Sequence, residues 1–222
     1  MTSNALSLLF ALFAAVFAVA SGSAFAEVQP RDENLPARVP YVFPRPGTNQ
    51  IADDIRSRRE NGTLLALDGA LLNAPLVAQG WNQLFTVIRE NLTIPADMRE
   101  LFILRTAVIN NAAYQWGQHE SVGRAEGLTT RQLRVLRFAP EGACSFADQK
   151  ILGDRLAAAL DFADAIGTSV RVPTHVYKNL ARFLSPQQMV EAAATAGGYA
   201  FVSRFTVSLN VDGKMNAEVP VP

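Results

Sequence analysis

The sequence contains two histidines, so imidazole chemistry must involve His119 or His175. His119 lies in the stretch NNAAYQWGQHESVGRAEG, on a predicted helix, and Glu100 lies on the predicted helix before it. If these helices pack together, the carboxylate approaches the imidazole, fixes its tautomer and raises its basicity. This Glu-His pair predicts an acid-base site, although two such side chains can equally satisfy each other as a polar pair in a core.

The remaining reactive side chains are less promising. His175 follows Pro173 in the first turn of a predicted helix with a basic exposed face, which favours a structural role. Cys144 is the only cysteine, so no intrachain disulfide and no C-x-x-C redox pair can form. Nothing near Cys144 except a helix N-terminus would make its thiol reactive. With one suitable histidine, no metal site is expected.

The positions of apolar residues predict the elements around this pair. Apolar residues recur at spacings of three and four from Asn49 to about Val211, with no competing strand alternation, which predicts an all-α compact multi-helix bundle. Asn110-Asn111 predicts a break between the helices of Glu100 and His119, and Gly127 predicts the end of the second. Start signals for the other helices stand at Asn73-Pro75, Pro95, Thr129 or Thr130, Ser145, Pro173 and Ser185-Pro186.

Several apolar side chains bear on packing and assembly. In the helix that begins at Pro75, a stripe is predicted to face the core, formed by Leu76, Val77, Trp81, Leu84 and Val87. The preceding segment has more leucines than one small bundle should bury, namely Leu64, Leu65, Leu67, Leu71 and Leu72. These leucines predict a homo-oligomer, a dimer or larger.

The ends of the chain differ in composition from this helical part. Residues 1–26 are predicted to be a signal peptide, because an apolar run precedes small residues that end at Ala26. Residues 27–48 are rich in proline and predict an extended arm, either a flexible tail or a strap across a neighbouring subunit. Residues 49–213 form the predicted helical domain, and residues 214–222 form a C-terminal tail.

The expected location follows from the leader. We expect a secreted protein, and Asn61 and Asn91 begin N-x-T tripeptides that could carry glycans. Acidic and basic residues balance at 20 each and form no long runs, so neither nucleic acid nor, after signal cleavage, a membrane is an expected partner. A small-molecule substrate is the expected partner besides further copies of the chain.

The stretch from Glu100 to Gly127 resembles the signature of carboxymuconolactone decarboxylase-like and alkylhydroperoxidase D-like proteins. In that superfamily a glutamate opens one helix, and C-x-x-C with a following histidine, or Y-E-W-x-x-H in a non-redox branch, lies on the next. Tyr114 to His119 (YQWGQH) resembles the non-redox form, and the peroxidatic cysteine positions fall on Ala112 and Gln115. The resemblance covers roughly residues 65–211 and implies an alkylhydroperoxidase D-like helical fold without peroxidase activity.

For function, the resemblance implies a cofactor-independent lyase or isomerase that acts on a small lactone, enolisable acid or quinone-like substrate. His119 would transfer the proton and Glu100 would support it, and the predicted substrate-binding residues are Tyr114, Gln115, Trp116 and Arg105. Gln115 replaces the glutamate of the Y-E-W form, which removes a second carboxylate. The alternative is a non-catalytic helical binding or scaffold protein, because a fold does not establish chemistry.

Overall fold

The computed structural model describes residues 37–169 and 171–222, and within this part of the chain every regular element is helical. The predicted all-α class is therefore confirmed. The predicted signal peptide, residues 1–26, and the first part of the arm lie outside the described residues. No helix in the described part is both long and apolar enough to cross a membrane.

The helices follow one another through short connections, as a compact bundle requires. Their bounds are α1 (Gln50–Arg56), α2 (Ala66–Leu71), α3 (Pro75–Thr86), α4 (Ala96–Ile109), α5 (Ala113–Ala125), α6 (Thr130–Phe138), α7 (Phe146–Thr168), α8 (Thr174–Leu180) and α9 (Pro186–Ser208). A π-helical turn, η2 (Val87–Asn91), extends α3, and a 3₁₀ turn, η3 (Val211–Gly213), follows α9.

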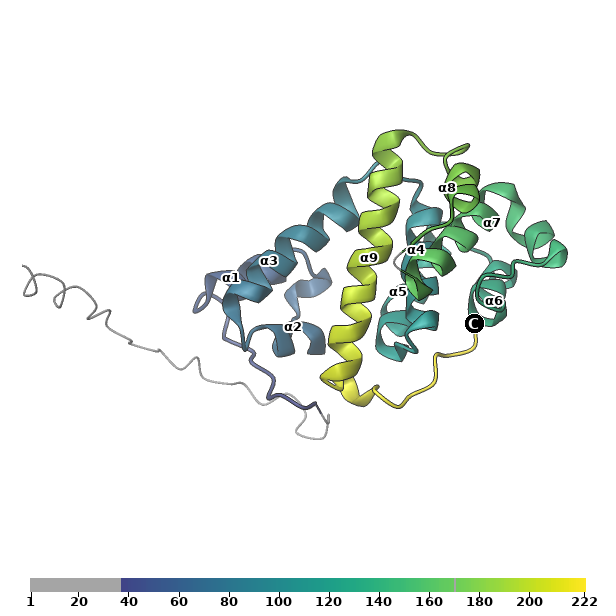
Figure 1. Cartoon of the computed structure of the whole chain (residues 1–222). Coiled ribbons are helices and arrows are strands. Elements are labelled where there is room, and N and C mark those ends of the chain that lie inside the picture. The colour runs from purple at the N-terminus through teal and green to yellow at the C-terminus, as the bar shows by residue number, and fades with distance from the viewer. Residues whose placement is uncertain (1–36, 170) are drawn as a thin grey trace, which may run out of the picture.

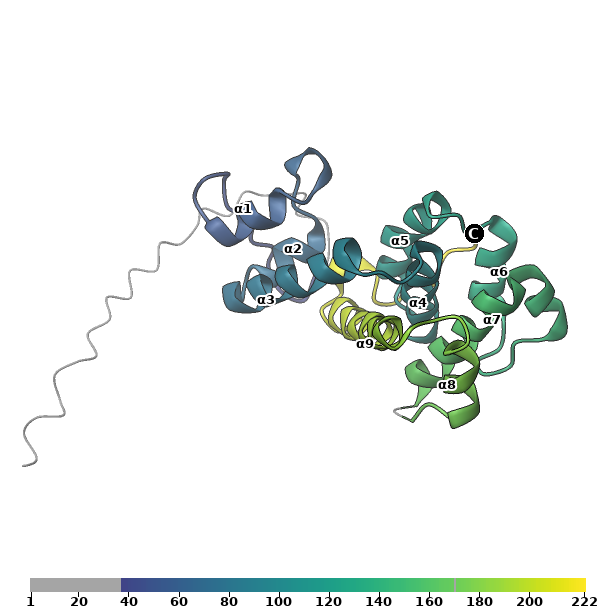
Figure 2. The ribbon, with the colours of Figure 1, turned by 90° about the horizontal axis from the view of Figure 1, so that it is seen from above.

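The core is divided into two apolar clusters with α9 between them. Helices α1 to α3 lie on one side of α9 and helices α4 to α8 on the other, and the view along α9 separates the two groups (Figures 1 and 2). Phe85, Trp81 and Val202 belong to the cluster on the α1–α3 side, whereas Phe102 and Leu160 belong to the other. A space between these two groups can therefore be lined by residues that are distant in sequence.

Helix α4 is the central helix of the second group. From Glu100 to Ala107 every residue is buried, because α4 packs against α5, α7 and α9 at once. Helix α5 follows α4 after the predicted break, where Asn111 adopts a left-handed conformation with φ of 48°. The two helices pack closely at Gly123, since a Cβ there would meet Leu104 Cδ1 at 3.0 Å. This antiparallel hairpin places the start of α4 beside the second half of α5.

The predicted start signals agree with the observed caps. Thr129, Ser145 and Ser185 each accept a hydrogen bond from the backbone N–H three residues on and complete a capping box. The helix predicted to start at Pro173 is short: α8 ends at Leu180, and the backbone N–H of Phe183 bonds to Leu180 O in the turn that follows.

The described part of the N-terminal arm packs on its own chain. The backbone N–H of Arg38 bonds to Leu209 O and that of Val42 bonds to Gly69 O. Phe43 is buried and lies so close to Gly69 that a Cβ there would approach the phenyl ring to 2.5 Å. From residue 37 onwards, the arm is therefore a strap over α2 and the end of α9, and not a free tail. At the other end of the chain, Val219 of the tail is buried in the α4–α8 cluster.

The structure corrects the packing predicted for α3. Leu76, Val77, Leu84 and Val87 are exposed, at 80%, 49%, 48% and 47%. Of the predicted stripe only Trp81 is buried, and it is joined by Ala78, Phe85 and Ile88, because the aromatic side chains pack on α9. The leucines that were expected to need a partner subunit are mostly covered within the chain, since Leu64, Leu67, Leu71 and Leu72 are buried.

Candidate active site

His119 and Glu100 meet as the hairpin of α4 and α5 requires. His119 Nδ1 lies 2.9 Å from Glu100 Oε2, and the side chains are 12% and 2% exposed. A carboxylate can only accept a hydrogen bond, so Nδ1 carries the proton and Nε2 of a neutral imidazole keeps its lone pair. Arg99 Nε donates to the other carboxylate oxygen at 3.3 Å. The pair is therefore a buried carboxylate that orients an imidazole.

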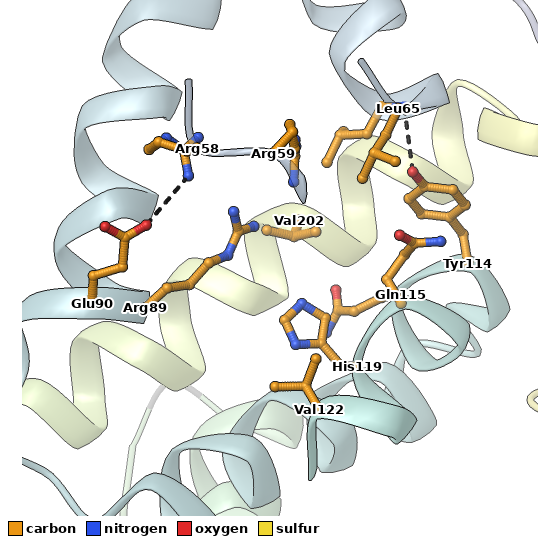
Figure 3. A pocket seen from close by; sticks show the side chains of 12 residues that line it. Arg58, Arg59, Leu65, Arg89, Glu90, Tyr114, Gln115, His119, Val122 and Val202 are labelled. Carbon is orange, nitrogen blue, oxygen red and sulfur yellow. Dashed lines mark hydrogen bonds and ion pairs between the residues drawn. The ribbon is translucent and has the colours of Figure 1, made fainter. Parts of the chain in front are cut away.

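The imidazole borders a cavity of about 200 Å³ between the two groups of helices. Figure 3 shows His119 on one side of this space, with Arg89 and Val202 opposite and Tyr114 and Gln115 further along α5. The other lining residues are Arg58, Arg59, Leu65, Leu67, Glu90, Gln118 and Val122. The cavity is thus assembled from α1–α2, η2, α5 and α9.

Arg89 brings a cation to the cavity from the π-helical turn η2. Its Nε donates to the Tyr199 hydroxyl at 2.9 Å, and its guanidinium carbon lies 5.6 Å from the centre of the Phe85 ring. The buried Tyr199 ring stands edge-on to the His119 imidazole, with centroids 5.0 Å apart. Burial raises the pKa of Tyr199, although Arg89 acts in the opposite direction. Tyr199 therefore stays a neutral phenol that fixes both neighbours.

Arg58 and Arg59 reach the cavity from the turn after α1. Arg59 forms two hydrogen bonds with the carboxylate of Asp68, at 3.0 and 2.5 Å, and its charge is balanced there. Arg58 donates to Asn82 Oδ1 through Nε at 2.7 Å, and its Nη1 lies 3.9 Å from the half-exposed Glu90 (Figure 3). Burial lowers the pKa of Arg58, and repulsion from Arg89 and Arg59 lowers it further.

Two of the predicted substrate-binding residues, Tyr114 and Gln115, line the cavity. The Tyr114 hydroxyl accepts a hydrogen bond from the backbone N–H of Leu67 at 3.4 Å, and burial raises the pKa of its phenol. Gln115 uses its amide to join three helices: Nε2 donates to Ile103 O at 2.8 Å, and Oε1 accepts from Ser203 at 3.0 Å. Gln115 therefore acts mainly in positioning α5 against α4 and α9.

The structure does not bring the other two, Trp116 and Arg105, to the cavity. Trp116 is fully buried in the α4–α8 cluster, and its indole N–H donates to Glu120 at 2.9 Å. Arg105 is also fully buried and forms two hydrogen bonds with Asp164, at 2.5 and 3.0 Å. Both were expected to bind substrate, but each points from its helix into the protein core. Their role is structural.

Four polar residues of this site were missed by the sequence analysis, namely Arg58, Arg59, Arg89 and Tyr199. Arg58 and Tyr199 are distant from His119 in sequence, and no spacing rule connects them to it. Arg89 had a usable signal, because it is the first charged residue after α3, a helix without any Asp, Glu, Lys or Arg. A cation directly after an uncharged helix is a candidate for a position at a binding site.

Residues 75–147 match the model of the carboxymuconolactone decarboxylase family. Over this segment the chain is carboxymuconolactone decarboxylase-like. The matched segment holds Glu100, His119 and Arg89, but it excludes Arg58 and Arg59, which line the cavity, and Tyr199, which holds Arg89. Among curated proteins, none matches this chain.

Solved structures resemble this carboxymuconolactone decarboxylase-like chain in fold. The debrominase Bmp8 without ligand has a TM-score of 0.61 at 18% identity over 76% of this chain and 88% of that one. A cysteine-to-alanine variant of that debrominase, in complex with 2,3,4-tribromopyrrole, has a TM-score of 0.60 at 17% identity, over 81% and 94%. A protein of unknown function from Agrobacterium tumefaciens, described as a candidate antioxidant defence protein AhpD, has a TM-score of 0.55 at 16% identity, over 68% and 95%.

The histidine and cysteine outside this cavity lie together elsewhere. Cys144 and His175 line a second depression beside α7 and α8, with Asp161 and Asp164. Burial and the carboxylates of Asp161 and Asp148 raise the pKa of the Cys144 thiol to about 11. At neutral pH this carboxymuconolactone decarboxylase-like chain therefore presents an unreactive thiol. Ala112 and Gln115 are buried and carry no sulfur at the positions where the redox branch has its cysteines.

Proposed function

We propose that the protein is a cofactor-independent enzyme in which His119 moves a proton to or from a carbon atom of a small enolisable substrate. The observation that carries this proposal is the contact of Glu100 with Nδ1 of an imidazole that borders a cavity. A carboxylate in that position keeps the second ring nitrogen free to act as a base. The family match of the surrounding segment supports an enzyme that acts on a small molecule.

The reaction needs two groups besides the base. When His119 Nε2 removes a proton next to a carbonyl group, the electron pair of the C–H bond becomes an enolate, and the imidazole becomes an imidazolium that Glu100 stabilises. Arg89 then stabilises the negative oxygen across the cavity. Return of the proton to another carbon completes an isomerisation. In a decarboxylation, His119 starts as the imidazolium. Carbon dioxide leaves first, the electrons of its C–C bond form the enolate, and the imidazolium then protonates the carbon and becomes the neutral imidazole.

The open space favours an enzyme over the alternative of a non-catalytic scaffold. In a non-catalytic scaffold, apolar side chains could fill the space beside the Glu-His pair. The fold would then be more stable than with a cavity lined by polar groups. A cavity of about 200 Å³ suits one small ring with its substituents. The solved complex of the debrominase variant with 2,3,4-tribromopyrrole, a small ring bound by a protein of similar fold, supports the same size class.

The proposal is tested by exchange of substrate hydrogen with solvent. Lactones, enolisable acids and quinone-like compounds are incubated with the protein in deuterium oxide, and exchange at carbon is followed by NMR. For a compound that exchanges, His119→Ala should slow the exchange by about 10²–10⁴-fold. His175→Ala is the matched control, because His175 is exposed and lies away from the cavity. Exchange at the parent rate in His119→Ala would mean that another group transfers the proton.

A further inference from the structure

The cavity has an excess of positive charge on the side opposite His119. Arg58, Arg59 and Arg89 all line it, whereas Glu90 is the only carboxylate among the described residues that line it. Asp68 balances Arg59 through two hydrogen bonds. The Glu90 side chain is 52% exposed, and its Oε1 comes no closer than 3.9 Å to Arg58 Nη1. Solvent therefore screens the attraction between Glu90 and Arg58. Two guanidinium charges therefore remain poorly balanced, those of Arg58 and Arg89.

Arg89 also has donors to spare. Its Nε is used by the Tyr199 hydroxyl, but within the described part of the chain neither of its terminal nitrogens has a hydrogen-bond partner. Tyr199 and the Phe85 ring hold the guanidinium in place, so that its free edge is directed into the cavity (Figure 3). A guanidinium with a fixed plane and free N–H groups is suited to bidentate binding of a carboxylate.

We propose that Arg89 and Arg58 together form the subsite for a carboxylate group on the small ring that the cavity binds. Arg89 donates to the carboxylate directly, and Arg58 supplies the second charge. Bringing in an anion also relieves the repulsion between these two guanidinium groups. The volume of about 200 Å³ leaves room for a six-membered ring, because a cavity of roughly 150 Å³ can hold benzene.

The anion subsite depends on parts of the chain beyond the family match. Arg58 stands before residue 75, in the turn after α1, and Asn82 of α3 holds it through Nε at 2.7 Å. Tyr199, which holds Arg89, belongs to α9 and also lies outside the matched segment. The anion subsite thus combines Arg89 of the matched segment with Arg58 and Tyr199 from outside it, whereas the Glu-His pair lies wholly within the matched segment.

The inference rests on the proposed function for the position of the substrate, but its test needs no turnover. Binding of benzoate and of its uncharged analogue benzamide is measured by NMR titration of the labelled full-length protein. Benzoate should bind at least about tenfold more tightly, as expected when two charges are compensated. Arg58→Gln should reduce this preference about tenfold, and Arg58→Lys should keep most of it. Added salt should weaken the binding of benzoate but not the binding of benzamide.

Two controls separate this subsite from proton transfer. Arg131→Gln makes the same change of charge on the exposed face of α6 and should leave the preference unaltered. His119→Gln should still prefer benzoate, so loss of catalysis and loss of the anion subsite can be told apart. The proposal is overturned if benzoate fails to bind at millimolar concentration, if benzamide binds as well as benzoate, or if Arg58→Gln leaves the preference intact while the protein remains folded by circular dichroism.

Discussion

Glu100 supports His119 through charge as well as through geometry. Glu100→Gln keeps one acceptor for the Nδ1 proton but loses the negative charge that stabilises an imidazolium. The exchange rate should fall about tenfold, less than in His119→Ala, because a hydrogen bond to a charged group is stronger than a neutral one by roughly 1–1.5 kcal/mol. Glu126→Gln is a suitable control, since Glu126 shares the partner Arg99 but does not touch the imidazole. Equal losses in both variants would contradict the assigned role.

The Cys144 thiol gives a prediction about pH. Its pKa is raised to about 11 by burial and by nearby carboxylates, so only about one thiol in 10⁴ is a thiolate at pH 7. Alkylation by iodoacetamide, followed by mass spectrometry, should be slow at pH 7 and rise about tenfold per pH unit up to that pKa. The purified protein should also fail to reduce hydroperoxides with dithiol donors. Turnover that persists in Cys144→Ser would contradict this second expectation.

Among the helices, the Arg105–Asp164 pair joins α4 to α7. Arg105 also donates to the carbonyl oxygens of Leu136 and Ala139, so this one buried side chain connects α6 to α4 and α7. Arg105→Ala should destabilise the fold by about 3–5 kcal/mol in denaturant unfolding, because it leaves the Asp164 carboxylate buried without its partner. The double substitution Arg105→Met with Asp164→Leu should cost less, since no buried charge remains.

This prediction separates the structural role of Arg105 from the substrate-binding role expected from sequence. Where the variant is folded, its exchange rate per folded molecule should equal that of the parent protein. A folded Arg105→Ala protein with normal stability and impaired substrate binding would instead support the substrate-binding role.

At the scale of the whole molecule, several large apolar side chains are exposed on α3, η2 and α9. Leu76, Val77 and Leu84 of α3 and Val87 of η2 are exposed, and so is Phe201 of α9, whose ring packs against Trp81 of α3. Helix α3 has no charged residue, so two copies of this surface can meet without electrostatic repulsion. We propose that the protein is a homo-oligomer through this surface, and not through the leucines of residues 64–72.

Leu84→Glu should dissociate the oligomer, because it places a charge at the centre of the apolar contact. Light scattering at micromolar concentration should then show the mass of one chain, 24.0 kDa for the full sequence, in place of a multiple of the wild-type chain mass. Ile151→Glu changes a residue of α7 with 40% exposure and should leave the assembly intact. A wild-type protein that is already monomeric would contradict the proposal.

Local patterns in the sequence were sufficient for the fold class, for most helix bounds and for the Glu-His pair. Caps such as Ser145 and Ser185 act within one turn, and a short break at Asn110-Asn111 forces two helices of similar length into an antiparallel hairpin. The distance between Glu100 and His119 follows from that hairpin, because both residues lie on adjoining elements. Tyr114 and Gln115, which were expected to bind substrate, line the cavity, whereas the bonds of Gln115 to Ile103 and Ser203 were not expected.

Tertiary packing decided the remaining features, because helical periodicity does not say which face meets which neighbour. Helix α3 is apolar on two faces, and only the aromatic packing of Trp81 and Phe85 on α9 shows which of them is internal. Helix α4 is buried on all sides, so spacing alone could not tell that Arg105 faces Asp164 while Glu100 faces His119. The cations of the cavity come from separate elements that meet only in the folded chain, and no local rule could bring Arg58 and Arg89 together.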